Sequence, residues 1–508
     1  MAITSSTERA GGEPVDAALE LRGIDKVYPG GVHAVAGVDL DVFPGEIHAL
    51  CGENGAGKTT LASIAAGKLK ATAGTVVARG NVGLVHQHFE LVDRLRVWEN
   101  VVLGREPRRG AELDRAAARA EVERLSREYG LAVDPDAVVE TLPVGIAQRV
   151  ELLRELARDP AVLILDEPTA VLAPAEIDAL FATVRALAQR GTAVLIITHK
   201  LQEVVAHTSR ITVMRAGKVV ARLETGRTNV DDIARAMVGG ELPELAARLE
   251  IAQHQALAVH GLSAGESSLA VRDASFEVRG GEIVGVAGVE GNGQSALADA
   301  LAGVIPYRGT IELGGVVLPA GDPAQRIACG IRTIPQDRRR EALVLPWSIV
   351  ENAALGDQRS PSLRRGATVD RKAARELAKR IVERFDVRTP SVDTSVSELS
   401  GGNQQKVVVG RALAHDPKFL LVYQPTRGID VGAAALVQSR LIEARNAGVA
   451  VLLISFELDE VLALSDRVIV MYRGSIVGTF ERGSIDRARI GSLMAGAGLQ
   501  AEPVVESA

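Results

Sequence analysis

Short apolar runs alternate along this chain with longer stretches in which apolar and polar residues are mixed. Clear runs cover Ile47 to Cys51, Val162 to Leu165 and Ala193 to Ile197, and each has the length of a buried strand. The mixed stretch from Leu61 to Leu69 has the character of a helix. Strands that alternate with helices predict an α/β fold whose sheets are largely parallel.

Two further stretches are rich in charge and predict amphipathic helices, one over 111–129 and one over 371–385. We assign both to a helical subdomain and interpret their charges as solvated helix faces. The apolar runs are strand-sized and far shorter than a membrane span requires. Residues 1–16 contain no apolar core, so they do not predict a secretory signal.

The chain repeats one plan twice. The stretch from Pro44 to Thr60 returns 236 residues later as Gly280 to Ala296, and Val213 to Val220 returns 257 residues later as Val470 to Val477. The larger second offset predicts insertions in the second half, after its glycine-rich loop. The predicted parts are a loose N-terminus over 1–16, a first domain over 17–240, a connector over 241–256, a second domain over 257–496 and a tail over 497–508.

The composition is that of a globular chain. Among 508 residues, 47% are hydrophobic and 24% are charged, which is enough apolar material for more than one core. A net charge of −6 argues against a broad nucleic-acid footprint. The two cysteines, Cys51 and Cys329, lie in different halves and predict no disulfide framework. We expect Cys51 to be a small core residue at the end of a strand.

The first chemical motif is a glycine-rich stretch that follows the first apolar run directly. Gly52, Gly57, Lys58 and Thr59 match the phosphate-loop pattern G-x-x-x-x-G-K-[ST]. The glycines allow backbone N–H groups to approach phosphate oxygens, Lys58 reaches the β- and γ-phosphates, and the Thr59 hydroxyl ligates Mg²⁺. The predicted nucleotide-binding residues of this loop are Gly52, Glu53, Asn54, Gly55, Ala56, Gly57, Lys58, Thr59 and Thr60.

Two carboxylates end the second apolar run. Asp166 suits Mg²⁺ coordination and Glu167 suits activation of the attacking water. Gln87 is a candidate to orient that water or a Mg²⁺ ligand, and His199 is a candidate contact of the γ-phosphate. Tyr28 is a candidate to stack on adenine. Each residue has a structural alternative, and the order of the motifs favours the catalytic interpretation.

A second phosphate-facing element lies in the second half, between Leu399 and Lys406. Ser400 followed by two glycines at a helix start offers a hydroxyl, close backbone approach and the helix dipole to an anion. Its predicted binding residues are Ser400, Gly401, Gly402 and Asn403.

With these motifs in this order, the chain resembles the ATPase subunit of an ABC transporter, with two nucleotide-binding domains fused in tandem. The resemblance covers nearly all of residues 17–497. It implies two P-loop NTPase domains, each with a RecA-like core, an antiparallel β subdomain and a helical subdomain. In this family the domains pack head to tail, and each ATP lies between the phosphate loop of one and the LSGGQ-like signature of the other. The implied cofactors are ATP and Mg²⁺.

The second half departs from the family pattern at its catalytic positions. Gln294 stands where the lysine belongs, and Phe456 replaces the histidine. Tyr423 and Gln424 replace the aspartate and glutamate at the strand end. The first half departs elsewhere, because its signature reads 142–146 as LPVGI, without the serine and one glycine.

All the losses fall on one of the two composite sites that the family pattern implies. Ala173 stands in the first half where the second half keeps Asp430, and this loss falls on the same site. We therefore predict one hydrolytic and one degenerate site, with Glu167 as the general base. The hydrolytic site is predicted to comprise Lys58, Thr59, Gln87, Asp166, Glu167, His199, Ser400, Gly401, Gly402 and Asp430. The degenerate site is predicted to comprise Gly288, Gly291, Gly293, Gln294, Ser295, Tyr423, Gln424 and Phe456, and to hold nucleotide without cleaving it.

The second half also resembles ATPases of simple-sugar and nucleoside importers. Two stretches, 86–93 and 143–150, resemble the nucleoside branch, and a ribose- or xylose-type importer is the alternative. The implied partners are two membrane permease subunits, lodged near Gln87 and Gln336, and an extracytoplasmic substrate-binding lipoprotein. The resemblance implies a peripheral position on the cytoplasmic face of the membrane, with no nucleic acid and no need for a homodimer. Ribosome-associated and DNA-repair ABC ATPases are the remote alternatives; the degenerate site, the short connector and the lack of a cysteine cluster disfavour them.

Overall fold

The computed structural model describes residues 16–53, 55–86, 89–110, 112–169, 172, 174–240, 247–250, 254–266, 269–366, 368–484, 486–494 and 496. Residues 1–15 of the predicted N-terminal segment, residues 241–246 and 251–253 of the predicted connector, and the whole tail lie outside these residues. The chain divides into two compact units, Met1–Leu242 and Pro243–Ala508, each with its own sheets and core. Within the described residues, no helix is both long and apolar enough to cross a bilayer.

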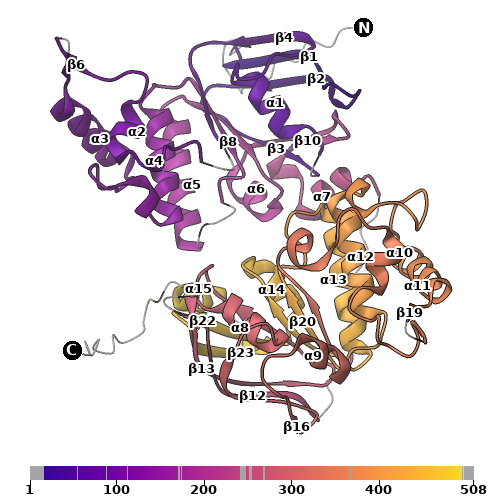
Figure 1. Ribbon diagram of the computed structural model, residues 1–508. Helices are drawn as coiled ribbons and strands as arrows, with labels where there is room; N and C mark the ends of the chain where they lie inside the picture. Colours follow the sequence, from indigo (N-terminus) through magenta and orange to yellow (C-terminus); the bar gives the residue numbers. More distant parts are fainter. Residues whose placement is uncertain are drawn as a thin grey trace, which may run out of the picture. The chain divides into compact units, whose positions relative to one another are not determined.

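A small antiparallel sheet opens the first unit (Figure 1). Its strands are β1 (Leu19–Val27), β2 (His33–Val42) and β4 (Ala73–Ala78), in the order β2-β1-β4. Alternate residues of β2, among them Val38, Leu40 and Val42, are buried, as expected of a sheet with one face on the core.

A six-stranded sheet forms the centre of the first unit, in the order β11-β10-β3-β9-β8-β5. Its strands are β3 (Ile47–Gly52), β5 (Val82–Val85), β8 (Val162–Asp166), β9 (Ala193–Ile197), β10 (Arg210–Arg215) and β11 (Lys218–Glu224). Neighbours are parallel except for β10 and β11. Every residue of β8 and β9 is buried because both faces of the sheet are covered. Since parallel strands end at the same edge, the residues that follow β3, β8 and β9 are brought together.

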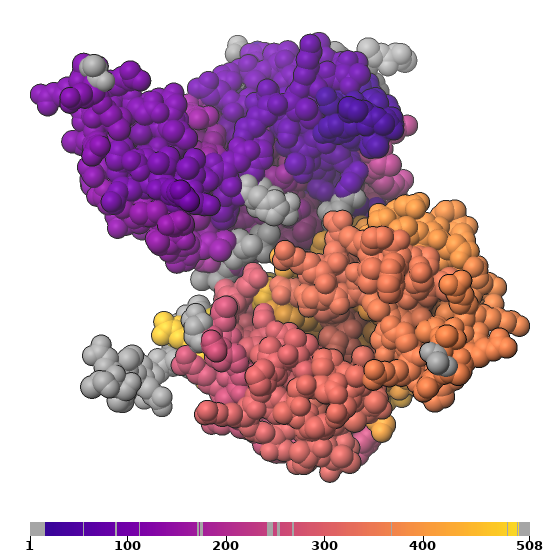
Figure 2. Space-filling view, in the orientation of Figure 1, coloured from indigo at the N-terminus to yellow at the C-terminus, as the bar shows by residue number. Residues whose placement is uncertain are grey.

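Helices cover this sheet. They are α1 (Lys58–Ala65), α2 (Val97–Val102), α3 (Arg115–Tyr129), α4 (Val144–Leu156), α5 (Pro174–Gln189), α6 (Leu201–His207) and α7 (Val230–Val238). One core joins α1 to the antiparallel strands, and another joins α2 to α5 on the opposite side. The helical part forms a purple lobe beside the indigo lobe of the antiparallel strands (Figure 2).

The helix expected over 111–129 begins later, at Arg115. Glu112–Leu113 form strand β7 instead, paired with β6 (Arg108–Arg109). Asp114 then caps α3, since its carboxylate accepts from the backbone N–H of Ala117 at 3.0 Å. The capping aspartate therefore sets the start of the helix, which the charge pattern alone did not reveal.

The second unit repeats the plan (Figure 1). An antiparallel sheet holds β12 (Gln255–Ala264), β13 (Val271–Arg279), β15 (Tyr307–Leu313) and β16 (Val316–Val317). The central sheet, in the order β17-β20-β21-β14-β22-β23, holds β14 (Ile283–Ala287), β17 (Ile331–Ile334), β20 (Phe419–Tyr423), β21 (Ala450–Ile454), β22 (Arg467–Tyr472) and β23 (Ser475–Glu481). A hairpin pairs β18 (Arg364–Arg365) with β19 (Thr368–Val369). The helices are α8 (Gln294–Ala302), α9 (Pro323–Cys329), α10 (Ile349–Ala354), α11 (Arg371–Arg384), α12 (Gly401–Leu413), α13 (Val431–Asn446), α14 (Leu458–Leu464) and α15 (Arg487–Met494).

The insertion predicted for the second half is present. The first unit passes from β4 to β5 directly, whereas the second adds β16 and α9 between β15 and β17. Helix α11 matches the helix expected over 371–385 to within one residue.

Candidate functional site

The phosphate loop joins β3 to α1. Gly57 is the N-cap of α1 with φ of 96°, and a Cβ on it would overlap the carbonyl oxygen of Ala34. A Cβ on Gly52 would overlap the carbonyl oxygen of Met214. Both positions therefore require glycine, and the loop presents its N–H groups at the helix start, where an anion is favoured.

Lys58 lies inside this loop and is 7% exposed. Its Nζ donates to the carbonyl oxygens of Gly52 at 2.8 Å and Glu53 at 3.0 Å. Burial lowers the pKa of Lys58, and the neighbouring carboxylates of Glu167 and Asp166 oppose that shift. The ammonium is thus buried between the loop and two acids, as a cation that receives phosphate should be.

Asp166 at the end of β8 faces Thr59 at the start of α1. Its carboxylate is 2% exposed and hydrogen-bonds the Thr59 side chain. Burial raises the pKa of Asp166, and the Thr59 hydrogen bond opposes that rise. A hydroxyl beside a buried carboxylate offers the hard oxygen ligands that Mg²⁺ prefers. Since the described residues hold no group of three acidic, histidine or cysteine side chains that could bind a metal, Mg²⁺ here would take its other ligands from water and phosphate.

Glu167 follows Asp166 and is paired with His199. Glu167 Oε1 lies 2.8 Å from His199 Nδ1, and the Glu167 backbone N–H donates to Ile197 at 2.8 Å. The glutamate backbone is left-handed, with φ of 51°, which costs on the order of 1–3 kcal/mol unless its surroundings impose it. Gln424 has the same conformation, with φ of 53°, so this backbone belongs to the fold and the carboxylate is what the first unit adds.

The other predicted residues of the first unit are placed as follows. Tyr28 is exposed beside the loop, with its hydroxyl 3.4 Å from Thr60 Oγ1, and Lys26 Nζ lies 5.4 Å from its ring centroid. Asn54 and Gln87 lie outside the described residues, as does Ala173. Cys51 is fully buried at the end of β3, as expected, and burial raises the pKa of its thiol to about 12.

In the second unit, Ser400 caps α12. Asn403 donates to Ser400 Oγ through its backbone N–H at 3.4 Å and its side-chain amide at 3.0 Å. A Cβ on Gly402 would lie 2.8 Å from Asp430 Oδ2, so Asp430 and the signature lie together. The corresponding helix α4 begins after Pro143 without a side-chain cap, which agrees with the loss of the serine.

The second unit's loop has the same backbone conformation, with a glutamine in place of the lysine. Gly291 and Gly293 have φ of 92° and 95°, close to Gly55 and Gly57 at 83° and 96°. Gln294 takes the place of the lysine and is 1% exposed. Its amide Nε2 donates to the Val289 carbonyl at 3.0 Å, while its Oε1 accepts from the Asn292 backbone N–H at 3.0 Å. Gln294 therefore uses one of the loop's own backbone donors.

Aromatic side chains replace the acid and histidine chemistry of this loop. Ser295 Oγ lies 2.9 Å from the hydroxyl of Tyr423, which stands where Asp166 stands in the first unit. The Tyr423 ring meets Phe456 edge-on, with centroids 5.9 Å apart. A further departure was not evident from the motifs: aligning the two glycine-rich stretches places Ala264 opposite Tyr28, so no aromatic side chain stands at that position.

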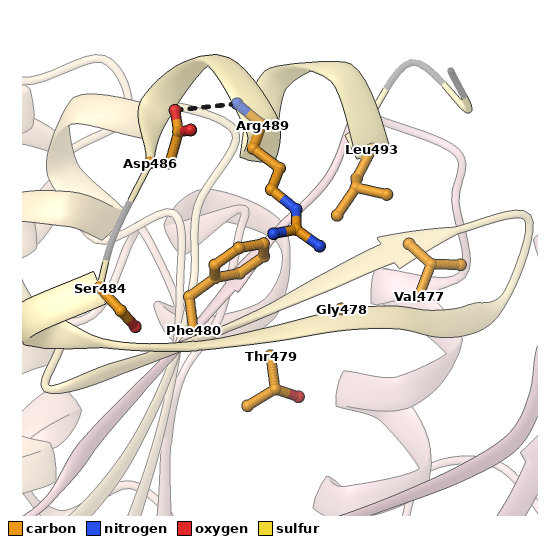
Figure 3. A pocket seen from close by; sticks show the side chains of 8 residues that line it. All are labelled: Val477, Gly478, Thr479, Phe480, Ser484, Asp486, Arg489 and Leu493. Carbon is orange, nitrogen blue, oxygen red and sulfur yellow. Dashed lines mark hydrogen bonds between the residues drawn. The ribbon is translucent and has the colours of Figure 1, made fainter. Parts of the chain in front are cut away.

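A separate cavity of about 580 Å³ lies between β23 and α15 (Figure 3). Arg489 extends from the helix over the Phe480 ring, 5.8 Å from its centroid. None of the motif residues lines this cavity, so it is not part of the phosphate chemistry.

The first unit's geometry defines a P-loop nucleoside triphosphatase, since a lysine in a glycine loop faces two acids at the edge of a parallel sheet. A family model described as "ABC transporter" matches residues 35–170 and 271–427.

The chain is 41% identical over 477 residues to the nucleoside import ATP-binding protein NupA of Lactococcus lactis, covering 90% of this chain and 94% of NupA. It is 40% identical over 496 residues to the guanosine import ATP-binding protein NupO of Bacillus subtilis, covering 94% and 97%. Equal identity, 40% over 496 residues, relates it to the ribose import ATP-binding protein RbsA 1 of Streptomyces avermitilis, covering 94% and 93%.

A solved structure of the archaeal ribosome recycling factor aABCE1, in complex with ribosomal stalk protein aP1, shares the fold. Its TM-score is 0.65 over 90% of each chain, at 18% identity, which concerns the fold alone. The family match and the relatives show that the chain belongs to the ABC transporter family, as an ATP-hydrolysing protein with two ATP-binding domains.

Proposed function

We propose that the chain powers a membrane importer for nucleosides and hydrolyses ATP at the phosphate loop of its first unit. The observation that carries the catalytic part is the 2.8 Å pairing of Glu167 with His199, next to the buried Lys58. The nucleoside preference is supported by the relatives named for nucleoside and guanosine import. Ribose is the second candidate, because the relative named for ribose import has the same identity to this chain as the relative named for guanosine import.

In the proposed mechanism, the loop N–H groups and Lys58 bind the triphosphate and offset its charge. Thr59 and Asp166 would hold Mg²⁺, and the ion would neutralise charge on the phosphates. Glu167 takes the proton of the attacking water. The His199 ring, whose Nδ1 lies 2.8 Å from Glu167 Oε1, keeps the Glu167 carboxylate oriented.

The second unit is proposed as non-hydrolytic. It lacks the lysine, the Mg²⁺ carboxylate and the base, because Gln294, Tyr423 and Gln424 stand at those positions. Its intact signature, from Ser400 to Asn403 with Asp430, is proposed to serve hydrolysis at the first unit's loop.

The partners proposed are two membrane permease subunits and an extracytoplasmic substrate-binding lipoprotein, with the chain held peripherally at the cytoplasmic face. The support is that the relatives are named as ATP-binding proteins of importers. Affinity purification of the chain from membranes, followed by mass spectrometry, tests it: recovery of permeases supports the proposal, and recovery of ribosomal proteins instead contradicts it.

The catalytic assignment is tested by Glu167→Gln. The amide keeps the size of the side chain and removes the base, so we expect hydrolysis to fall by about 10²–10⁴-fold while ATP binding persists. Glu123→Gln on the exposed face of α3 is the matched control and should leave hydrolysis unchanged. Steady-state phosphate release with a parallel binding assay gives the answer, and full activity in Glu167→Gln would rule out this base.

A further inference from the structure

The last residue of β9 and the segment that follows it contact the turn after β8 at four points. Two of them involve Glu167, namely the backbone bond to Ile197 and the side-chain pair with His199, both at 2.8 Å. The other two involve Thr169. Lys200 Nζ donates to the Thr169 carbonyl oxygen at 3.0 Å, and the Thr169 hydroxyl donates to Glu203 Oε2 at 2.7 Å.

The side chains that make the contacts with Thr169 are largely shielded from solvent. Thr169 is 1% exposed, and Lys200 and Glu203 side chains are 16% and 14% exposed. Lys200 Nζ also lies 3.9 Å from Glu203 Oε1, so the carboxylate orients the ammonium toward the turn. A charge-assisted bond to a buried carbonyl resists displacement more than a neutral bond does.

The second unit serves as an internal comparison. Its turn keeps the backbone bond, from Gln424 to Ile454 at 2.8 Å, and keeps the bond between Thr426 and Glu460. It has Phe456 in place of His199 and Glu457 in place of Lys200. The two units therefore share two contacts, and the unit with the carboxylate base has two more, one from His199 and one from Lys200.

We infer that Lys200 is a positioning residue for hydrolysis: its bond to Thr169 fixes the turn that carries Glu167. This rests on the proposed function, in which Glu167 is the base. Lys200 acts through the turn, because it binds the carbonyl oxygen of Thr169, two residues after Glu167 in the chain. Displacing a catalytic group by about 1 Å can cost on the order of 10²-fold in rate, and a loosened turn displaces it without altering the phosphate loop.

The test compares Lys200→Met, which keeps the aliphatic stem and removes the donor, with Lys200→Arg, which keeps a cationic donor. Single-turnover hydrolysis and ATP affinity are measured in the full chain. We expect Lys200→Met to slow hydrolysis by about 10–10²-fold with unchanged ATP affinity, and Lys200→Arg to retain most of the rate. Glu457→Met, at the matching position of the second unit, should hydrolyse ATP at the normal rate.

A double variant separates positioning from a general loss of structure. If Lys200 acts through Glu167, adding Lys200→Met to Glu167→Gln should slow hydrolysis no further. An unchanged rate in Lys200→Met, a weaker ATP affinity with an unchanged rate, or a full additional loss in the double variant would each overturn the inference. Should Lys200→Met fail to fold by its melting curve, Lys200→Gln takes its place with the same expectations. Full activity in Glu167→Gln would instead defeat the proposed function, so the two failures are distinguishable.

Discussion

The two phosphate loops differ most in the side chain after their last glycine. Lys58 only donates to its loop, through two carbonyl oxygens, and keeps a positive charge for phosphate. Gln294 is a neutral amide that both donates and accepts. Its Oε1 occupies the Asn292 N–H that an anion would use. The glutamine therefore stabilises the empty loop and competes with a phosphate group.

This difference predicts the effect of Gln294→Lys. The lysine frees the Asn292 N–H and adds a charged donor, and a hydrogen bond to a charged group is worth about 1.5–3 kcal/mol. We expect the second loop to bind nucleotide about 10–10²-fold more tightly, while hydrolysis stays the same because Tyr423 and Gln424 remain. Equilibrium dialysis with a labelled ATP analogue, counting nucleotides per chain, measures this. Unchanged affinity would show that the glutamine is not what limits binding.

Some residues of the site could be predicted from the sequence, and others could not. Lys58, Thr59, Asp166, Glu167 and His199 follow strands of one parallel sheet, so their order along the chain was enough to predict that they meet. The role inferred for Lys200 was not predictable, because no motif contains it and its contact depends on where the segment between β9 and α6 lies in three dimensions. The acceptor bond of Gln294 was hidden for the same reason: the sequence shows a missing charge and not where the amide turns.

At the scale of elements, the period of apolar residues predicted the central strands well. The largely apolar and buried strands β3, β8 and β9 are what a sheet covered on both faces requires. The start of α3 was missed, since a two-residue strand and a capping aspartate are short-range features that charge patterning does not encode.

A buried acid in α14 gives a prediction about stability. Burial raises the pKa of Glu460, which is 6% exposed, and hydrogen bonds from Ser455, Thr426 and Gln438 only partly offset it, while the nearby Glu457 adds to the rise. The contribution of the protonated acid to stability is complete below its unfolded pKa and is lost as pH rises through the higher folded pKa. Each unit of difference between the two pKa values is worth about 1.4 kcal/mol.

Glu460→Gln should remove this loss. The neutral amide fits the same bonding partners, so we expect the variant to gain about 1–3 kcal/mol of stability relative to the wild type at about pH 8, and little at about pH 4. Urea unfolding across this pH range, for both proteins, measures the gain. If the free energy of unfolding changed with pH in the same way for both proteins, burial of Glu460 would not be the cause of the pH dependence.

At the scale of the whole molecule, one chain carries two copies of a fold with different chemistry. The repeat and the order of its motifs were legible in the sequence, and so was the family. The transported molecule was not, because the phosphate loops bind ATP whatever is carried. The fold does not decide it either, since a ribosome recycling factor shares the fold at a TM-score of 0.65. The nucleoside assignment therefore rests on sequence relatives.

The measurement that tests the account most directly is uptake of labelled guanosine, uridine and ribose by cells that express either the intact chain or Glu167→Gln. The account predicts that Glu167→Gln abolishes uptake of the nucleosides and leaves ribose uptake unchanged. Loss of ribose uptake alone would keep the ATP chemistry and contradict the nucleoside assignment. Normal uptake of all three would contradict the claim that hydrolysis at Glu167 drives their import.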